Sequence, residues 1–109
     1  MEEKNERIFT LGQVLNITTG RVFTSMDDIV DILSYLSQEQ LYTLGLTEVA
    51  PAARSYILGR YPQLAGVGKT ERFHSREEGD AFLEQQSKVV GSEFALSPMQ
   101  KEKPKVYTR

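Results

Sequence analysis

Ser25-Met-Asp-Asp-Ile-Val-Asp-Ile-Leu-Ser-Tyr-Leu36 is the stretch that most clearly predicts the fold. A serine before the stretch is a favourable N-cap, and Asp27 and Asp28 fall in the first turn, where the helix dipole stabilises negative charge. Apolar side chains then recur at helical spacing, at Met26, Ile29, Val30, Leu33 and Leu36, with Ile32 widening the stripe. We therefore expect an amphipathic helix that packs against the rest of the chain.

The segment before this helix predicts a second, shorter one. Thr10 is a suitable N-cap, apolar residues follow at helical spacing, and Gly20 stands where a helix commonly ends. Residues 1–9 are rich in charge, and we expect them to form a flexible N-terminus.

Two further helices are predicted after residue 36. Ser37-Gln-Glu-Gln40 resembles a capping box, so a short helix containing Leu41 and Leu44 is expected to end at Gly45. Thr47 would cap the next helix and place Pro51 in or near its first turn, where a missing amide proton costs little. Pro62 would stop that helix.

The second half of the chain has a different pattern. Leu64 to Thr70 is expected to be a loop, and Thr70 to His74 a short strand. A capping box at Ser75 then opens a helix to about Val90, with apolar residues at Ala81, Phe82, Leu83, Val89 and Val90, and Gly91 ends it. A strand containing Phe94 and Leu96 ends before Pro98.

Together these patterns predict one mainly helical α+β domain over residues 10–99, in which an N-terminal helix cluster precedes a strand–helix–strand unit. Residues 100–109 are expected to form a flexible basic tail. The chain has 109 residues and a net charge of −2, as expected for a single modest core. It has no cysteine, no membrane-length apolar run and no apolar segment after its acidic start, so we expect a soluble cytoplasmic protein.

The sequence offers little for catalysis. Gly66-Val-Gly-Lys-Thr70 resembles the end of a phosphate-binding loop, but that pattern requires glycine where Gln63 stands. His74 is the only histidine, and the serines at 25, 37 and 75 are explained as helix caps. We therefore expect no enzymatic activity, no cofactor and no metal site.

The charges are separated along the chain, which suggests an interaction surface. No Lys or Arg lies between Arg21 and Arg54, and the acids there make Asp27, Asp28, Asp31 and Glu39 the candidate protein-contact residues. From residue 54 to 76 the sign reverses. Direct nucleic-acid binding is the alternative, and it would use Arg54, Arg60, Lys69, Arg72 and Arg76.

Two stretches, Leu11-Gly-Gln-Val-Leu-Asn-Ile-Thr-Thr-Gly-Arg21 and Met26-Asp-Asp-Ile-Val-Asp-Ile-Leu-Ser-Tyr-Leu36, resemble small proteins of tailed phages and prophages. The resemblance extends through Arg60-Tyr-Pro-Gln-Leu64 and Phe94-Ala-Leu-Ser-Pro98, although the glycine-rich loop and the basic tail depart from it. That family has no assigned activity and offers no site residue to carry over.

The resemblance implies an accessory protein that binds a host or phage protein complex and inhibits or redirects it, for example an anti-CRISPR-like inhibitor of host defence. A small nucleic-acid-binding regulator and a virion-associated or scaffold component are the alternatives.

Overall fold

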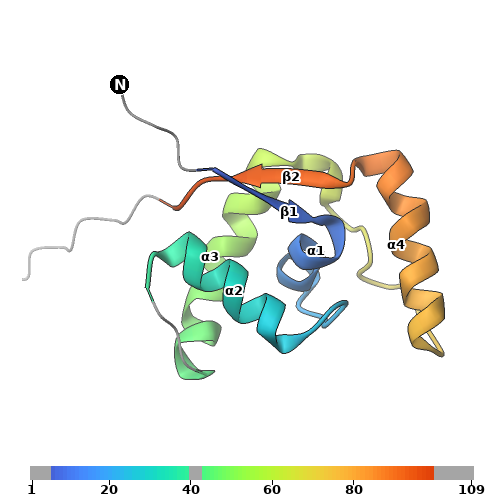
Figure 1. The fold of residues 1–109 in the computed structure, drawn as a ribbon, viewed down its shortest axis with the longest axis horizontal. Coiled ribbons are helices and arrows are strands. Elements are labelled where there is room, and N and C mark those ends of the chain that lie inside the picture. The colour runs from blue at the N-terminus through green and yellow to red at the C-terminus, as the bar shows by residue number, and fades with distance from the viewer. Residues whose placement is uncertain (1–5, 40–42, 100–109) are drawn as a thin grey trace, which may run out of the picture.

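The computed structural model describes residues 6–39 and 43–99 of the chain. These residues form a mainly helical α+β domain with a small antiparallel sheet, as predicted (Figure 1). The elements in chain order are β1 (Arg7–Thr10), α1 (Leu11–Thr19), α2 (Met26–Ser37), α3 (Thr43–Arg60), the 3-10 helix η1 (Pro62–Leu64), α4 (Arg76–Val90) and β2 (Glu93–Leu96).

Three helices begin at the predicted caps. The hydroxyl of Thr10 accepts a hydrogen bond from the amide of Gln13 at 3.2 Å, so α1 starts as expected. Ser25 accepts from the amide of Asp28 at 3.1 Å, and the equivalent bond at the start of α4 reaches Ser75 at 3.2 Å. These caps satisfy amide protons that have no partner inside the helix. The predicted positions of α1, α2 and α4 are confirmed.

The prediction of two helices between residues 41 and 61 was wrong, because α3 is one continuous helix from Thr43 to Arg60. It passes through Gly45 and contains Pro51 in its interior. Leu46, Ala53 and Ile57 lie on one buried stripe of this helix, whereas Pro51 lies on the exposed side. Packing of that stripe outweighs the local cost of the two helix-breaking residues.

The segment that joins α2 to α3 also differs from the prediction. Ser37 is the last residue of α2 and opens no new helix, and Gln38 ends α2 in the left-handed conformation with φ of +61°. Residues 40–42 lie outside the described part of the chain. They include the last residue of the predicted capping box and the first residues of the predicted short helix.

The sheet pairs the two ends of the domain. β1 and β2 are antiparallel, with Phe9 opposite Phe94, and both aromatic side chains are buried. The prediction of a flexible N-terminus is therefore wrong for residues 7–9, whereas residues 1–5 and the predicted tail at 100–109 are outside the described ranges. The predicted strand from Thr70 to His74 is also wrong, since that segment is irregular and β1 is the actual partner of β2.

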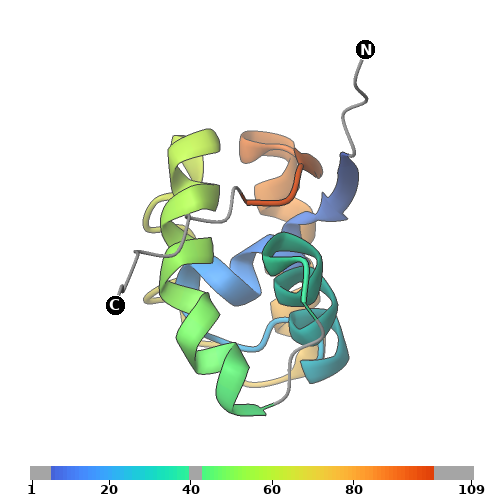
Figure 2. The ribbon, with the colours of Figure 1, turned by 90° about the vertical axis from the view of Figure 1, so that its left-hand side faces the viewer.

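The other edge of β2 is covered by tyrosines from α3 and the residue after it. The hydroxyl of Tyr61 donates to the carbonyl of Ala95 and accepts from its amide, both at 2.9 Å. Tyr56 makes the same pair of bonds with Ser97, at 2.8 and 3.3 Å. β2 consequently lies between α3 and β1, as Figure 2 shows.

The core surrounds α1, and α4 lies at its periphery. Seven of the nine residues of α1 are buried, while α4 contains no buried residue and stands at one end of the molecule in Figure 1. Of the apolar residues predicted on α4, Phe82, Leu83 and Val90 pack against the core. Val89 is 75% exposed, so it does not belong to that apolar side as predicted.

Candidate functional site

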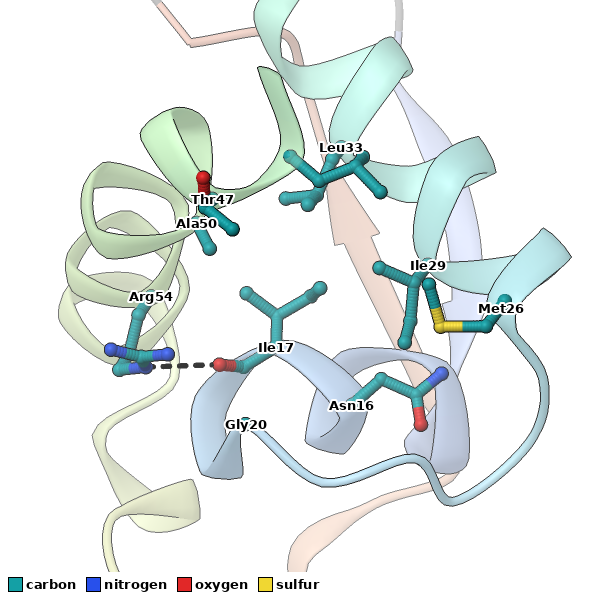
Figure 3. Close-up of a pocket in the computed structure, with 10 residues that line it drawn as sticks. Asn16, Ile17, Gly20, Met26, Ile29, Leu33, Thr47, Ala50 and Arg54 are labelled. Carbon is teal, nitrogen blue, oxygen red and sulfur yellow. Dashed lines mark hydrogen bonds between the residues drawn. The ribbon is translucent and has the colours of Figure 1, made fainter. Parts of the chain in front are cut away.

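An open apolar groove lies between α1, α2 and α3 (Figure 3). Its volume is about 300 Å³. The groove combines a mostly apolar lining with a few polar groups, which is the usual composition of ligand-binding hollows in proteins. Its apolar lining is Ile17 from α1, Met26, Ile29 and Leu33 from α2, and Leu46 and Ala50 from α3.

Met26 forms the exposed edge of this groove. The sequence placed it in the buried stripe of α2, but its side chain is 53% exposed, in contrast to the fully packed Leu33. It is the first residue of α2, where the helix extends beyond the core. A flexible, polarisable side chain beside an open hollow is suited to contact with partners of varied shape.

Among the described residues that line the groove, Arg54 is the only charged one. Its Nε donates a 3.0 Å hydrogen bond to the carbonyl of Ile17, one of the last carbonyls of α1, which lacks a partner within that helix (Figure 3). Within the ranges that the structure describes, its Nη1 and Nη2 groups have no hydrogen bond or ion pair. The groove thus presents a positive charge beside an apolar hollow.

Asn16 fixes the chain that leads into Met26. This buried side chain accepts hydrogen bonds from the amides of Phe23 at 2.6 Å and Thr24 at 3.2 Å, and it donates to the hydroxyl of Thr24 at 2.8 Å. An asparagine that satisfies three connector groups holds the connector in one conformation. The α1 and α2 walls of the groove are therefore fixed relative to each other.

One acid of the surface predicted on α2 is paired with a residue of β1. Asp31 is half-exposed and paired within the domain: its carboxylate accepts from both Nη groups of Arg7, at 2.9 and 3.2 Å, and from Gln13 at 3.2 Å. The hydrogen bond with Arg7 is the main reason that the pKa of Asp31 lies below its usual value. The Arg7 guanidinium also lies over the rings of Phe9 and Tyr35.

The other acidic candidates lie at opposite ends of α2. Asp27 is exposed and Asp28 is half-buried, both in the first turn beside Met26. Glu39 is exposed past the C-terminal end of the helix, next to the Arg7–Asp31 pair. Twelve residues of helix separate the two ends by roughly 18 Å. Asp27 and Asp28 are therefore at the end of α2 that supplies Met26 to the groove, although neither of them lines it.

Some of the basic candidates have partners within the domain, and others have none among the described residues. Besides Arg54 in the groove, Arg60 pairs with Glu6 at 2.8 Å. Arg76 and Asp80 approach to 4.0 Å on the surface of α4. Lys69 and Arg72 are exposed and have no ion pair in the described part of the chain. The predicted nucleic-acid residues thus have separate structural settings.

Arg21 is an organising residue that the sequence analysis missed. Its Nη1 donates to the carbonyls of Gly68 at 2.6 Å and Glu71 at 2.8 Å, and its guanidinium lies over the rings of Phe23 and Phe73. The glycine-rich segment is a series of turns held by this arginine, which confirms the predicted loop. The proximity of Arg21 to Phe23 in sequence was the available signal.

Across residues 6–39 and 43–99, no group of three or more His, Cys, Asp or Glu side chains is placed to hold a metal ion. No helix within the same ranges is both long and apolar enough to cross a membrane.

The match to a protein family coincides with the half of the chain that builds the groove. The model described as "Domain of unknown function (DUF7736)" matches residues 9–67, which include every residue that lines the groove and exclude α4. No curated protein and no solved structure matches the chain. Because the family match covers more than half of the sequence, the chain belongs to the DUF7736 family.

Proposed function

We propose that this protein is a non-enzymatic binding protein whose groove between α1, α2 and α3 receives an apolar part of a macromolecular partner. The observation that carries the proposal is the groove itself, with a half-exposed Met26 at its edge and an apolar floor. Exposed apolar surface beside a hollow is characteristic of interaction sites.

The charges around the groove would orient such a partner. Arg54 lies on the α3 side, and Asp27 follows Met26 on the α2 side. Opposite charges on two sides of a hollow favour one direction of binding and increase the association rate of a partner with complementary charge. Asp27 and Asp28 therefore remain proposed contact residues, whereas Asp31 and Glu39 are not needed for this site.

The biological setting that we propose follows from the phage resemblance. The protein would act in the host cytoplasm as a phage or prophage accessory protein that inhibits or redirects a host protein complex, such as one used in defence. The partner would bind in the groove, and the protein would need no cofactor.

Capture of partners from infected host cells, followed by binding measurements with two matched variants, tests this proposal. Ala50 lines the groove, whereas Ala52 is exposed on the same helix. Ala50→Phe fills the hollow, so we expect it to weaken partner binding by about tenfold or more, as expected when one well-placed interface residue is disturbed. Ala52→Phe should bind like the wild type.

The control for this comparison is folding, measured by circular dichroism and thermal unfolding of both variants. A folded Ala50→Phe protein with wild-type affinity for the captured partner would exclude the groove as the binding site.

The two other proposed functions make different predictions. A nucleic-acid-binding regulator would use Lys69 and Arg72, and its affinity for DNA or RNA should fall steeply as salt increases. A scaffold or virion component should show a mass that rises with protein concentration. We place both behind the groove-binding function because Arg60 and Arg76 lie beside acids and Arg54 belongs to the groove.

A further inference from the structure

We infer that the groove recognises the C-terminal residue of a partner chain, with the carboxylate on Arg54 and an apolar side chain in the hollow. This inference rests on the proposed binding function and specifies its ligand. It depends on the geometry of one guanidinium group and on the size and lining of the groove.

The hydrogen bond to Ile17 fixes the orientation of Arg54. Because Nε is occupied at 3.0 Å by the Ile17 carbonyl, the edge of the guanidinium formed by Nη1 and Nη2 remains available as far as residues 6–39 and 43–99 are concerned. That edge carries two N–H groups in the parallel arrangement that matches the two oxygens of a carboxylate. Gly20 lies next to this edge, since a Cβ atom there would be in van der Waals contact with Nη2 at 3.7 Å.

The apolar part of the ligand would lie next to this edge. In Figure 3, Arg54 stands on one side of the hollow, Ile29 and Met26 stand on the other, and Ile17 forms the floor between them. A volume of about 300 Å³ holds one or two side chains. A C-terminal residue fits this arrangement, because it carries a carboxylate and a side chain on the same Cα and continues in only one direction.

A purely structural role for Arg54 explains less. Capping the C-terminal end of α1 accounts for the Nε bond, and α1 has no basic residue in its own last turn. Capping does not require the unoccupied Nη groups to lie beside an apolar hollow. The structural role also predicts that the charge of a ligand makes no difference to its binding.

Titration of the full chain with two small compounds, followed by ¹⁵N NMR, separates these roles. N-acetyl-leucine carries the carboxylate and the apolar side chain, and N-acetyl-leucinamide is its neutral counterpart. We expect the acid to bind about tenfold more tightly, the difference expected for a charge-assisted hydrogen bond. The amide signals of Gly20 and Ala50 and the Nε–H signal of Arg54 should shift, and added salt should reduce the difference between the compounds.

Two arginine variants provide the matched comparison. Arg54→Gln keeps an N–H donor near the Ile17 carbonyl but removes the paired Nη groups, so its affinity for the acid should fall to that for the amide. Arg72→Gln changes an exposed arginine outside the groove and should keep the wild-type preference. The comparison of acid with amide on the wild type needs no variant, so poor folding of Arg54→Gln leaves the test intact.

Three outcomes would overturn the inference. Equal affinity of the wild type for the acid and the amide would show that Arg54 does not bind the carboxylate. The groove would remain the binding site in that case. Stronger binding of N-acetyl-aspartyl-leucinamide than of N-acetyl-leucine would assign the carboxylate to an internal acidic side chain. If neither leucine compound shifts the groove signals, the ligand class is wrong, and the Ala50→Phe comparison decides separately whether the groove binds a partner.

Discussion

The two longest helices of the domain, α3 and α4, are attached to it in different ways. α3 buries Leu46, Ala53 and Ile57 in the core, although it contains Gly45 and Pro51. α4 has a serine cap, acids in its first turn and Lys88 in its last, yet it contains no buried residue. Favourable local signals and burial are therefore independent properties of a helix. The family match, which ends at residue 67, includes the buried helix and leaves out the peripheral one.

Two leucine-to-alanine substitutions test this contrast with the same chemical change. Leu15 belongs to α1 and is fully buried in the core, whereas Leu83 on α4 is partly exposed. We expect Leu15→Ala to lower the free energy of unfolding by about 3 kcal/mol, and Leu83→Ala by about 1 kcal/mol, because the second leaves a smaller cavity. Urea denaturation monitored by circular dichroism measures both values, and equal losses would refute the peripheral position of α4.

Arg21 holds the turns that precede α4, so its replacement should destabilise α4 and these turns more than the rest of the domain. Arg21→Met keeps much of the side-chain volume but removes the donors to Gly68 and Glu71 and the charge over Phe73. We expect the free energy of unfolding to fall by roughly 1.5–3 kcal/mol, the range for hydrogen bonds that involve a charged group. Hydrogen exchange should become faster in α4 and in the turns before it, while α1 and α3 keep their relative protection.

The matched control for Arg21 is Arg72→Met. Arg72 is exposed and makes no ion pair in the parts of the chain that are described, so its replacement should leave exchange in α4 unchanged. Uniformly faster exchange throughout the domain in Arg21→Met would instead indicate that the two halves unfold as one unit.

The smallest expected effect concerns the ion pair that joins β1 to α2. The folded state lowers the pKa of Asp31, so the pair stabilises the protein above the ordinary aspartate pKa, and this contribution disappears as the pH falls through the lowered value. Because both side chains are about 45% exposed, Asp31→Asn should cost less than about 1 kcal/mol at pH 7, and the cost should decrease as the pH falls below the ordinary aspartate pKa.

Thermal unfolding of Asp31→Asn at several pH values measures this difference. Asp27→Asn is the control, since Asp27 is exposed on the same helix and has no ion pair among the described residues. An identical pH dependence of stability in the two variants would contradict the assigned role of the pair.

Local interactions explain which parts of the fold were predictable. The caps at Thr10, Ser25 and Ser75 act within three residues, so the sequence was sufficient to predict where those helices begin. The pairing of Phe9 with Phe94 joins opposite ends of the chain and leaves no local signal, and the continuity of α3 depends on packing against other helices. Those two features were accordingly mispredicted.

The candidate site was predicted only as separate residues. Met26 appeared as part of a core stripe and Arg54 as one of several basic residues, and no local pattern links these two residues. The groove exists because the end of α1, the start of α2 and the middle of α3 meet in space. For Asp31 the sequence indicated an exposed acid on α2, but its partner Arg7 lies in a segment that was expected to be flexible.

The tyrosines beside β2 have a consequence for the behaviour of the protein at high concentration. A sheet edge with unsatisfied amides and carbonyls can recruit strands from other molecules and lead to aggregation. Tyr56 and Tyr61 occupy the groups of Ala95 and Ser97 that a third strand would use, so further strands can be added only along β1. That edge is four residues long and begins with the charged Arg7, which makes it a poor template for polymerisation.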